Sequence, residues 1–260
     1  MTAALTEEQY RNGGNLRARI ALHQRFSTSD RRWLPWVFDQ LGLQAGQRVL
    51  EVGCGTGQLW IENADRVPDE LELTLTDLST GMLAEAGRSL RRAGVDGVTR
   101  RADAAALPFP DAAFDVVVAN HMLYHVGDLP GTVRELRRVL RPDGLLAAAT
   151  NGSDHLRELN DLVAAHAGGA VRHPLAVQLP FSLDNGAEHL GAAFGTVELR
   201  RYEDGLEITE AEPAVAYVGS MWSWDGAVDL EGLRQDLRRR IAEAGCLRVR
   251  KDSGLFLARP

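Results

Sequence analysis

Apolar and polar residues follow two different patterns in the first 150 residues of the chain. Short apolar runs, typical of strands buried on both faces, occur at residues 48–52, 71–76, 114–119 and 145–150. Apolar residues at helical spacing predict helices over 15–26, 33–41, 58–66, 79–93 and 128–140. Strands that alternate with helices indicate parallel βαβ units. The pattern therefore predicts a doubly wound α/β sheet with helices on both faces.

The regular alternation ends near residue 151. Beyond it we expect helices over 154–167, 182–193 and 229–244, and strands over 196–202 and 247–257. The Asp-Ser-Gly sequence at 252–254 predicts a break or bulge in the last strand. The segment between these two strands is too long for a hairpin and too apolar for a linker. We expect one domain over 1–260, with a helical cap formed by an N-terminal lid (1–43) and an insertion (205–245).

The composition narrows the class of protein. Apolar residues make up 45% of the chain and charged residues 25%, which is typical of a soluble globular protein. No apolar run approaches the ~18 residues of a membrane span, and the N-terminus has no apolar signal core. Two widely separated cysteines, Cys54 and Cys246, indicate a reducing cytoplasm. The net charge of −7 argues against a non-specific nucleic-acid binder, and Lys251 is the only lysine among 29 basic residues.

The candidate chemistry lies where the first strand ends. Residues 51–57 read Glu-Val-Gly-Cys-Gly-Thr-Gly, with three alternating glycines between a strand and a helix. Glycine allows a sharp bend and a close approach of a ligand to the backbone, and the following helix directs unpaired N–H groups into the same space. Asp77 stands 20 residues beyond Gly57, where a carboxylate can accept hydrogen bonds from a ribose diol. The pattern predicts a site for an adenosine-bearing ligand.

Two nucleotide-binding fingerprints are absent from this loop. The dinucleotide pattern G-x-G-x-x-G requires a third glycine where the chain has Gln58 or Trp60. A P-loop requires a Gly-Lys-Ser/Thr sequence, which does not follow the loop. These departures argue against an NAD-dependent oxidoreductase and a P-loop nucleotidase.

The chain resembles the class I S-adenosylmethionine (SAM)-dependent methyltransferases over about residues 47–150. Four motifs carry the resemblance, in order: Val49–Gly57, Thr76-Asp77-Leu78-Ser79 with Met82, Ala102-Asp103-Ala104 with Leu107-Pro108-Phe109, and Phe114–Asn120 with Leu123–Val126. The resemblance implies a Rossmann-like sheet of seven strands, mostly parallel with an antiparallel last strand. It also implies SAM as cofactor, S-adenosylhomocysteine as product and a small-molecule methyl acceptor as partner.

The family pattern assigns a role to each motif residue. The cofactor-binding residues implied by the resemblance are Glu51, Gly53, Cys54, Gly55, Gly57, Asp77, Leu78, Met82, Asp103, Ala104, Asn120 and His121, with Tyr10 and Arg19 from the N-terminal segment. Asp77 would hold the ribose hydroxyls, and Asn120 and His121 would lie beside the sulfonium. Leu78 and Met82 would flank the adenine, Asp103 would accept a hydrogen bond from its amino group, and the Ala104 N–H would donate to its ring. Asp77 could instead cap a helix near Ser79, and Asp103 could anchor a turn. Cys54 reads better as a small turn residue than as a nucleophile.

Fewer residues of the sequence indicate how the methyl acceptor would be bound. His125 is the candidate general base, because imidazole titrates near neutrality, although it could instead shape the pocket or cap the helix that begins near Asp128. His23, Tyr124, Tyr217, Trp222 and Trp224 are the candidate substrate residues. Core packing is the alternative for the aromatic residues, and a solvated basic helix that packs a histidine is the alternative for the segment with Arg19 and His23.

Other readings of the chain remain open at this point. We expect no metal site, because His121 and His125 have no identifiable third ligand. An RNA methyltransferase and a non-catalytic SAM-binding regulatory module are the alternatives to a small-molecule enzyme. The absence of a basic tract makes RNA the weaker acceptor, and the sequence carries no signal for oligomeric state.

Overall fold

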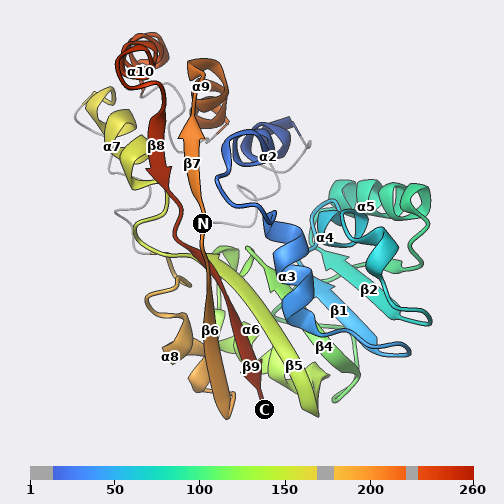
Figure 1. Ribbon diagram of the computed structural model, residues 1–260. Coiled ribbons are helices and arrows are strands. Elements are labelled where there is room, and N and C mark those ends of the chain that lie inside the picture. The colour runs from blue at the N-terminus through green and yellow to red at the C-terminus, as the bar shows by residue number, and fades with distance from the viewer. Residues whose placement is uncertain (1–13, 169–178, 221–227) are drawn as a thin grey trace.

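A computed structural model of the 260-residue chain describes residues 14–168, 179–220 and 228–260. Its main sheet has seven strands in the order β3-β2-β1-β4-β5-β9-β6 (Figure 1). The strands are β1 (Arg48–Val52), β2 (Glu72–Asp77), β3 (Val98–Arg101), β4 (Phe114–Asn120), β5 (Leu140–Asn151), β6 (Thr196–Tyr202) and β9 (Ser253–Arg259). Strands β1 to β5 pair in parallel, and β9 runs antiparallel to both β5 and β6. The predicted seven-stranded, doubly wound sheet with an antiparallel last strand is confirmed.

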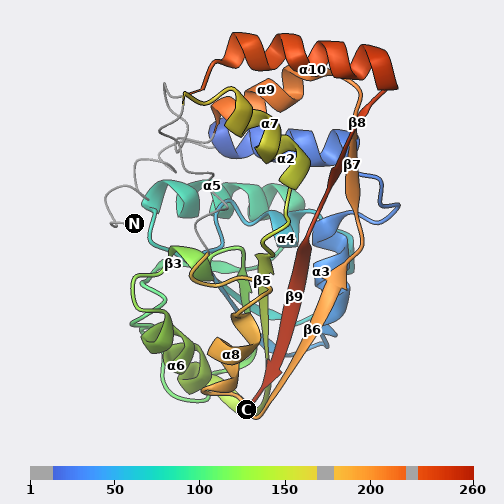
Figure 2. The same cartoon turned by 90° about the vertical axis from the view of Figure 1, so that its left-hand side faces the viewer.

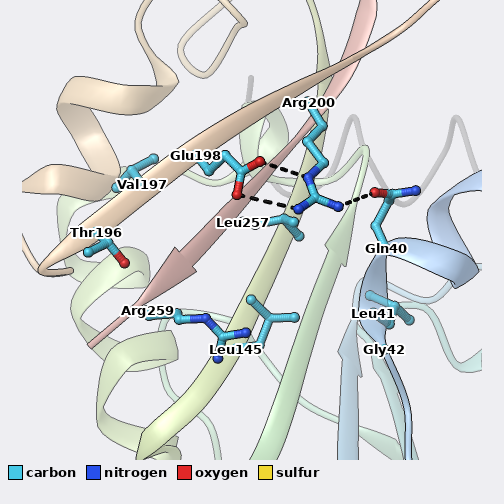
Figure 3. Close-up of a pocket in the computed structure, with 10 residues that line it drawn as sticks. All are labelled: Gln40, Leu41, Gly42, Leu145, Thr196, Val197, Glu198, Arg200, Leu257 and Arg259. Atoms are coloured by element: carbon cyan, nitrogen blue, oxygen red, sulfur yellow. Dashed lines mark hydrogen bonds and ion pairs between the residues drawn. The ribbon is translucent and has the colours of Figure 1, made fainter.

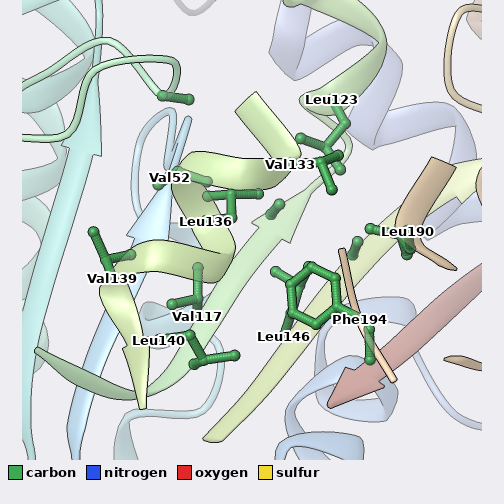
Figure 4. Close-up of a cluster of buried hydrophobic side chains, with 14 of the residues drawn as sticks. Val52, Val117, Leu123, Val133, Leu136, Val139, Leu140, Leu146, Leu190 and Phe194 are labelled. Carbon is green, nitrogen blue, oxygen red and sulfur yellow. The ribbon is translucent and has the colours of Figure 1, made fainter. Parts of the chain in front are cut away.

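Helices cover both faces of this sheet. One face packs against α3 (Trp33–Leu41), α4 (Gln58–Ile61) and α5 (Thr80–Ala93), and the other against α6 (Leu129–Val139) and α8 (Gly186–Gly191). Neighbouring side chains of a strand point to opposite faces of the sheet, so Val49 packs in the core on the α3–α5 side and Leu50 in the core on the α6 side. Figure 4 shows the α6 side, where Val133 and Leu136 lie against Val117 and Leu146.

The boundaries of several elements differ from the sequence prediction. The helix expected over 58–66 is divided into α4 and a 3-10 turn, η1 (Ala64–Arg66). Strand β5 begins at Leu140, ahead of the expected 145–150, and its pairing with β4 jumps from Leu140 to Leu145, so residues 141–144 form a bulge inside the strand. Strand β3 was not expected as a separate run because its four residues are exposed and mostly polar.

A second layer of elements stands beyond the carboxyl ends of the parallel strands (Figures 1 and 2). This cap contains α2 (Gly14–Phe26), α7 (Arg157–Ala165), α9 (Ala211–Gly219), α10 (Leu230–Ala244) and a two-stranded sheet of β7 (Gly205–Ile208) and β8 (Leu247–Arg250). It has its own core, in which Leu22 of α2 packs with Leu159, Val218 and Leu237. The proposed boundaries of the lid (1–43) and the insertion (205–245) stay predictions, and residues 1–13 and 221–227 lie outside the described residues.

The cap joins the main sheet through a narrow set of chain crossings. The strand expected over 247–257 is broken at 251–252, so β8 belongs to the cap and β9 to the main sheet. The neighbouring part of the chain is divided in the same way. Tyr202 of β6 pairs with Ser253 in the main sheet, and Gly205 of β7 pairs with Arg250 in the sheet of the cap. We call residues 27–29, 152–156, 203–205 and 250–253 the neck. Within the described residues, no helix is long and apolar enough to cross a membrane.

Candidate active site

The glycine loop between β1 and α4 has a backbone that ordinary side chains rarely adopt. Gly53, Gly55 and Gly57 have φ angles of 61°, 55° and 77°. A Cβ at Gly53 would lie 2.8 Å from the Cβ of Met122, and one at Gly57 would lie 3.3 Å from a methyl carbon of Leu75. A Cβ at Gly55 would meet no atom within 4 Å. Packing thus leaves no room for a Cβ at Gly53 and crowds one at Gly57, whereas Gly55 borders open space.

The carboxylate of Asp77 is tied to this loop. Its Oδ2 accepts the N–H of Gly55 at 3.0 Å, and its Oδ1 accepts the N–H of Ser79 at 2.8 Å. Burial raises the pKa of Asp77, although the backbone donors oppose the shift. The cap of α5 is Ser79, which accepts the N–H of Met82 at 3.3 Å. Asp77 therefore shapes the loop without being the helix cap, and its half-buried carboxylate lies at the end of β2 beside Gly55.

Glu51 lies below the loop in a buried position. Its Oε2 accepts the indole N–H of Trp60 at 2.7 Å. Burial raises the pKa of Glu51 to about 8, against the opposing effect of the Trp60 hydrogen bond and with a smaller contribution from Asp77. A carboxyl group with this pKa is largely neutral at pH 7 and becomes a carboxylate when a cation binds beside it.

Cys54 is a structural residue of the loop. Its side chain is buried, and burial raises the pKa of the thiol, so the reactive thiolate is disfavoured. Its N–H bonds to the carbonyl of Thr76 at 2.9 Å, and its carbonyl accepts the N–H of Gly57 at 3.0 Å. These contacts fit the reading of a small turn residue.

The residues expected around an adenine ring differ in exposure. Leu78 is 41% exposed, whereas Met82 and Ala104 are buried. Asp103 is exposed, and its Oδ1 accepts the N–H of Ala105 at 2.9 Å. Asp103 therefore anchors a turn in this structure and keeps its second carboxylate oxygen for another donor.

The carboxyl end of β4 presents two polar residues to the same edge. The Oδ1 atom of Asn120 is buried and has no hydrogen-bond partner among the described residues. His121 adopts a left-handed backbone with a φ of 55°. Burial lowers the pKa of His121 to about 4, with further lowering by Lys251 and His125. Its ring lies 5.1 Å from that of Trp33, between ring centroids, so this end of β4 faces α3 and the neck.

Tyr124 and His125 follow on the 3-10 turn η2 (Leu123–His125). Their ring centroids are 4.5 Å apart, and the N–H of His125 bonds to the carbonyl of Met122 at 2.9 Å. Helix α6 is capped by Asp128, whose Oδ1 accepts the N–H of Gly131 at 2.9 Å. His125 is therefore not the cap of α6, and the turn holds its ring close to that of Tyr124.

On the cap side, the structure brings together residues that are far apart in the sequence. The ring of His23 lies 6.0 Å from that of Tyr217, between centroids, in an edge-on arrangement. Sequence reasoning missed His155, whose ring stacks on His23, and the buried ion pair of Lys251 with Asp204. The available signals were the single lysine of the chain and the break at 252–254. Of the remaining expected residues, Tyr10, Trp222 and Trp224 lie outside the described residues, as does the side chain of Arg19 on α2.

Two hollows in the described structure lie away from these residues. The first, of about 320 Å³, lies between α3 and strands β5, β6 and β9, and the Arg200 side chain crosses it to Glu198 and Gln40 (Figure 3). The second, of about 700 Å³, opens on the outer side of the neck beside Asp204 and Arg250. None of the expected site residues lines either one. Among the described residues, no group of three or more histidines, cysteines and carboxylates could hold a metal ion.

Comparisons with known proteins agree with this geometry. Residues 50–148 match a family model described as a methyltransferase domain. The chain is 33% identical over 215 residues to 27-O-demethylrifamycin SV methyltransferase of Amycolatopsis mediterranei, an alignment that covers 78% of this chain and 70% of that protein. It is 33% identical over 137 residues to the ubiquinone/menaquinone biosynthesis C-methyltransferase UbiE of Shewanella sediminis, which covers 51% of this chain and about half (55%) of that relative.

A solved structure shows the same fold. The YcgJ protein of Bacillus subtilis superimposes with a TM-score of 0.59 at 20% sequence identity, and the match covers 87% of this chain and 98% of that one. At this identity the likeness concerns the fold alone.

Proposed function

The chain belongs to the class I SAM-dependent methyltransferases, and from this premise we propose that it methylates a small molecule held between the cap and the carboxyl ends of β1, β2 and β4. The observation that carries the proposal is the open space beside Gly55, which borders the carboxylate of Asp77 at the sheet edge. The cap core formed by α2, α7, α9 and α10 lies beyond the same edge. An acceptor can therefore be enclosed between the two.

The side chains present fit SAM. Leu78 leaves an exposed apolar surface for an adenine ring, and Asp77 has carboxylate oxygens for ribose hydroxyls. Glu51 can ionise beside an ammonium group, and the orphaned Oδ1 of Asn120 can receive a polar contact. When bound, SAM supplies a methyl group on a sulfonium, a reactive group that the protein itself does not provide.

The remaining residues position the acceptor and move a proton. We assign His125 as the general base that takes the proton of an acceptor hydroxyl and passes it to solvent. Tyr124 packs on His125 and fixes the ring, and the 3-10 turn holds both at the end of β4. Trp33 and the buried, neutral ring of His121 line the neighbouring edge and exclude water.

A small molecule is the acceptor that the chain favours. The net charge is −7, which disfavours approach of a polyanion such as RNA. The rifamycin methyltransferase aligns with 78% of this chain, far beyond the matched methyltransferase domain, so the likeness includes segments that form the cap. We therefore propose an oxygen acceptor of specialised metabolism. We also place the protein in the cytoplasm, a proposal supported by its two free cysteines.

Calorimetric titration of the purified protein tests the cofactor half of this proposal. SAM and S-adenosylhomocysteine should bind, and NAD should not. Transfer of a labelled methyl group from SAM to hydroxylated small molecules tests the second half. Binding of SAM without transfer to any acceptor in such a panel would favour the regulatory-module alternative, and transfer to RNA would overturn the assignment of the acceptor.

A further inference from the structure

A cluster of histidines surrounds Lys251 where the cap meets the sheet. The rings of His23 on α2 and His155 in the β5–α7 connection are stacked, with centroids 6.0 Å apart and an interplanar angle of 28°. Tyr217 of α9 meets His23 edge-on at 84°. His121, at the end of β4, interacts electrostatically with His23 and with Lys251. The cluster thus links the cap to the strand end where the acceptor is expected.

His155 is held rigidly by the neck. Its Nδ1 accepts the backbone N–H of Asp252 at 3.3 Å and lies 3.2 Å from the hydroxyl of Ser253. Its carbonyl accepts the amide of Asn160 at 3.0 Å. Because a backbone N–H can only donate, Nδ1 is an acceptor and the proton of the neutral ring resides on Nε2. Because the His155 ring is held in place, it also restrains the His23 ring that stacks on it.

His23 carries a polar atom that nothing in the described structure satisfies. Its Nδ1 is buried and has no hydrogen-bond partner among the described residues. Burial lowers the pKa of His23 to about 3, with Lys251 as the second cause, so the ring is neutral at physiological pH. A buried ring nitrogen without a partner is costly, and the ring is packed between His155, which stacks on it, and Tyr217, which meets it edge-on. This atom is therefore suited to a ligand.

The ion pair of the neck sets the electrostatic potential around His23. Lys251 pairs with Asp204, and both side chains are almost completely buried. The carboxylate accepts hydrogen bonds from a hydroxyl and three N–H groups on residues 27–29 and 205. Lys251 lowers the pKa of His23, His121 and His155, and its effect on His23 exceeds the opposing effect of Asp204. The positive charge of the pair therefore dominates at His23.

We propose that His23 Nδ1 recognises a hydroxyl group of the methyl acceptor, and that Lys251 makes the same position unfavourable for an ammonium group. A hydroxyl can donate to or accept from a neutral imidazole nitrogen, so it fits either tautomer of His23. An ammonium group would place a second positive charge beside Lys251. The inference rests on the proposed function and makes His23 a specificity-determining residue for hydroxylated, uncharged or anionic acceptors.

The experiment measures binding of three probes to the protein saturated with S-adenosylhomocysteine. The probes are 2-naphthol, 2-methylnaphthalene and 2-naphthylmethylammonium, which share one aromatic body. We expect 2-naphthol to bind best and the ammonium probe worst. His23→Phe, which keeps a stacked ring, should weaken 2-naphthol binding by about 10- to 100-fold and leave 2-methylnaphthalene unchanged. His23→Asn, which restores a polar atom near Nδ1, should recover part of the loss.

His189→Phe on α8, outside the histidine cluster, is the matched control and should bind all three probes as the wild type does. Unchanged 2-naphthol affinity in His23→Phe, preference for the ammonium probe, or no binding of 2-naphthol to the wild type would each overturn the inference. Binding of S-adenosylhomocysteine, measured in the same samples, reports separately on the proposed function. Its absence would overturn that function, whereas its presence with any of these three results would overturn only the role of His23.

Discussion

The sheet edge and the neck hold their polar groups in place by different means. At the sheet edge, the hydrogen bond from Gly55 to Asp77 joins positions only 22 apart in the sequence, at the ends of adjacent strands. At the neck, Asp204 binds Ser27 across 177 positions and Lys251 across 47. The first arrangement follows from one βαβ unit. The second exists only after the whole chain has folded, so the two regions should respond differently to substitution.

The two regions also differ in the space and the polar atoms that they leave available to a ligand. The sheet edge keeps open space at Gly55 and an exposed Leu78, both of which are suited to a cofactor. The ion pair of the neck is buried, and the adjoining His23 of α2 has a buried Nδ1 without a hydrogen-bond partner among the described residues. The space where we expect the cofactor is thus open, whereas the polar groups where we expect the acceptor are buried.

The largest effect is expected where the two regions meet, at His125. His125→Asn should lower kcat by about 10²- to 10⁴-fold, as for loss of a general base, with SAM affinity little changed. The pH–rate profile should lose its ascending limb. A raised KM with the pH dependence retained would show that His125 only shapes the pocket.

Removing the buried ion pair of the neck should destabilise the protein without affecting the cofactor site. Asp204→Ala leaves Lys251 as a buried, unpaired cation and should lower the free energy of unfolding by about 3–5 kcal/mol, measured by urea denaturation. Glu207→Ala, which removes an exposed ion pair with Arg248 in the same cap sheet, should cost at most about 1 kcal/mol. Equal losses in the two variants would contradict the role of the buried pair.

Filling the open space of the glycine loop should affect the cofactor site alone. Gly55→Val should weaken SAM binding at least ~100-fold, because the side chain enters the ligand's space and strains a positive φ. Gly94→Val is the matched control, since Gly94 has a φ of 70° and equally open surroundings at the end of α5. It should lose stability and keep its SAM affinity. Normal SAM binding by Gly55→Val would mean that the site lies elsewhere.

A smaller loss is expected at the ribose position. Asp77→Ala should weaken SAM binding by about 1.5–3 kcal/mol, because ribose hydroxyls lose a charged acceptor. Calorimetry on the folded variant measures the change, with Asp128→Ala, which removes only a helix cap, as the control. Unchanged SAM affinity would refute the assignment of Asp77 to the ribose.

A pH dependence of stability is expected at the sheet edge. The pKa of Glu51 is about 8 in the folded protein, above its ordinary value of 4.5, so the folded state retains a proton that the unfolded state has lost. The contribution of Glu51 to the free energy of unfolding should therefore fall as the pH rises from about 4.5 to 8. It opposes the contribution of the buried histidines, whose lowered pKa values make the folded state more stable as the pH rises.

Urea denaturation of the wild type and of Glu51→Gln at pH 5.5, 6.5 and 7.5 measures the slope of this contribution as the difference between the two proteins, because the histidines titrate alike in both. Glu135→Gln should retain the slope, because Arg138 lowers the pKa of Glu135 and that group does not titrate in this interval. A difference between the wild type and Glu51→Gln that does not change with pH would contradict the raised pKa of Glu51.

The sheet edge could be predicted from the sequence because its information is local. Buried strands read as apolar runs, and the glycines and Asp77 stand at fixed offsets from the strand ends. Strand β3 could not be read in this way, since its residues are exposed at the edge of the sheet. His155 and Asp204 carried no signal either, because their roles come from contacts between segments 97 to 177 residues apart.

The adjacency of Gly205 and Arg250 has a consequence for protein engineering. These two residues are paired across β7 and β8, so the chain leaves the neck and returns to it at neighbouring positions. The entropic cost of closing such an excursion grows only slowly with its length. A segment of different length or sequence, grafted between these two positions, would therefore leave the register of β6 and β9 unchanged. The acceptor range of this scaffold could be altered by exchanging that segment as a cassette while the cofactor-binding half is kept intact.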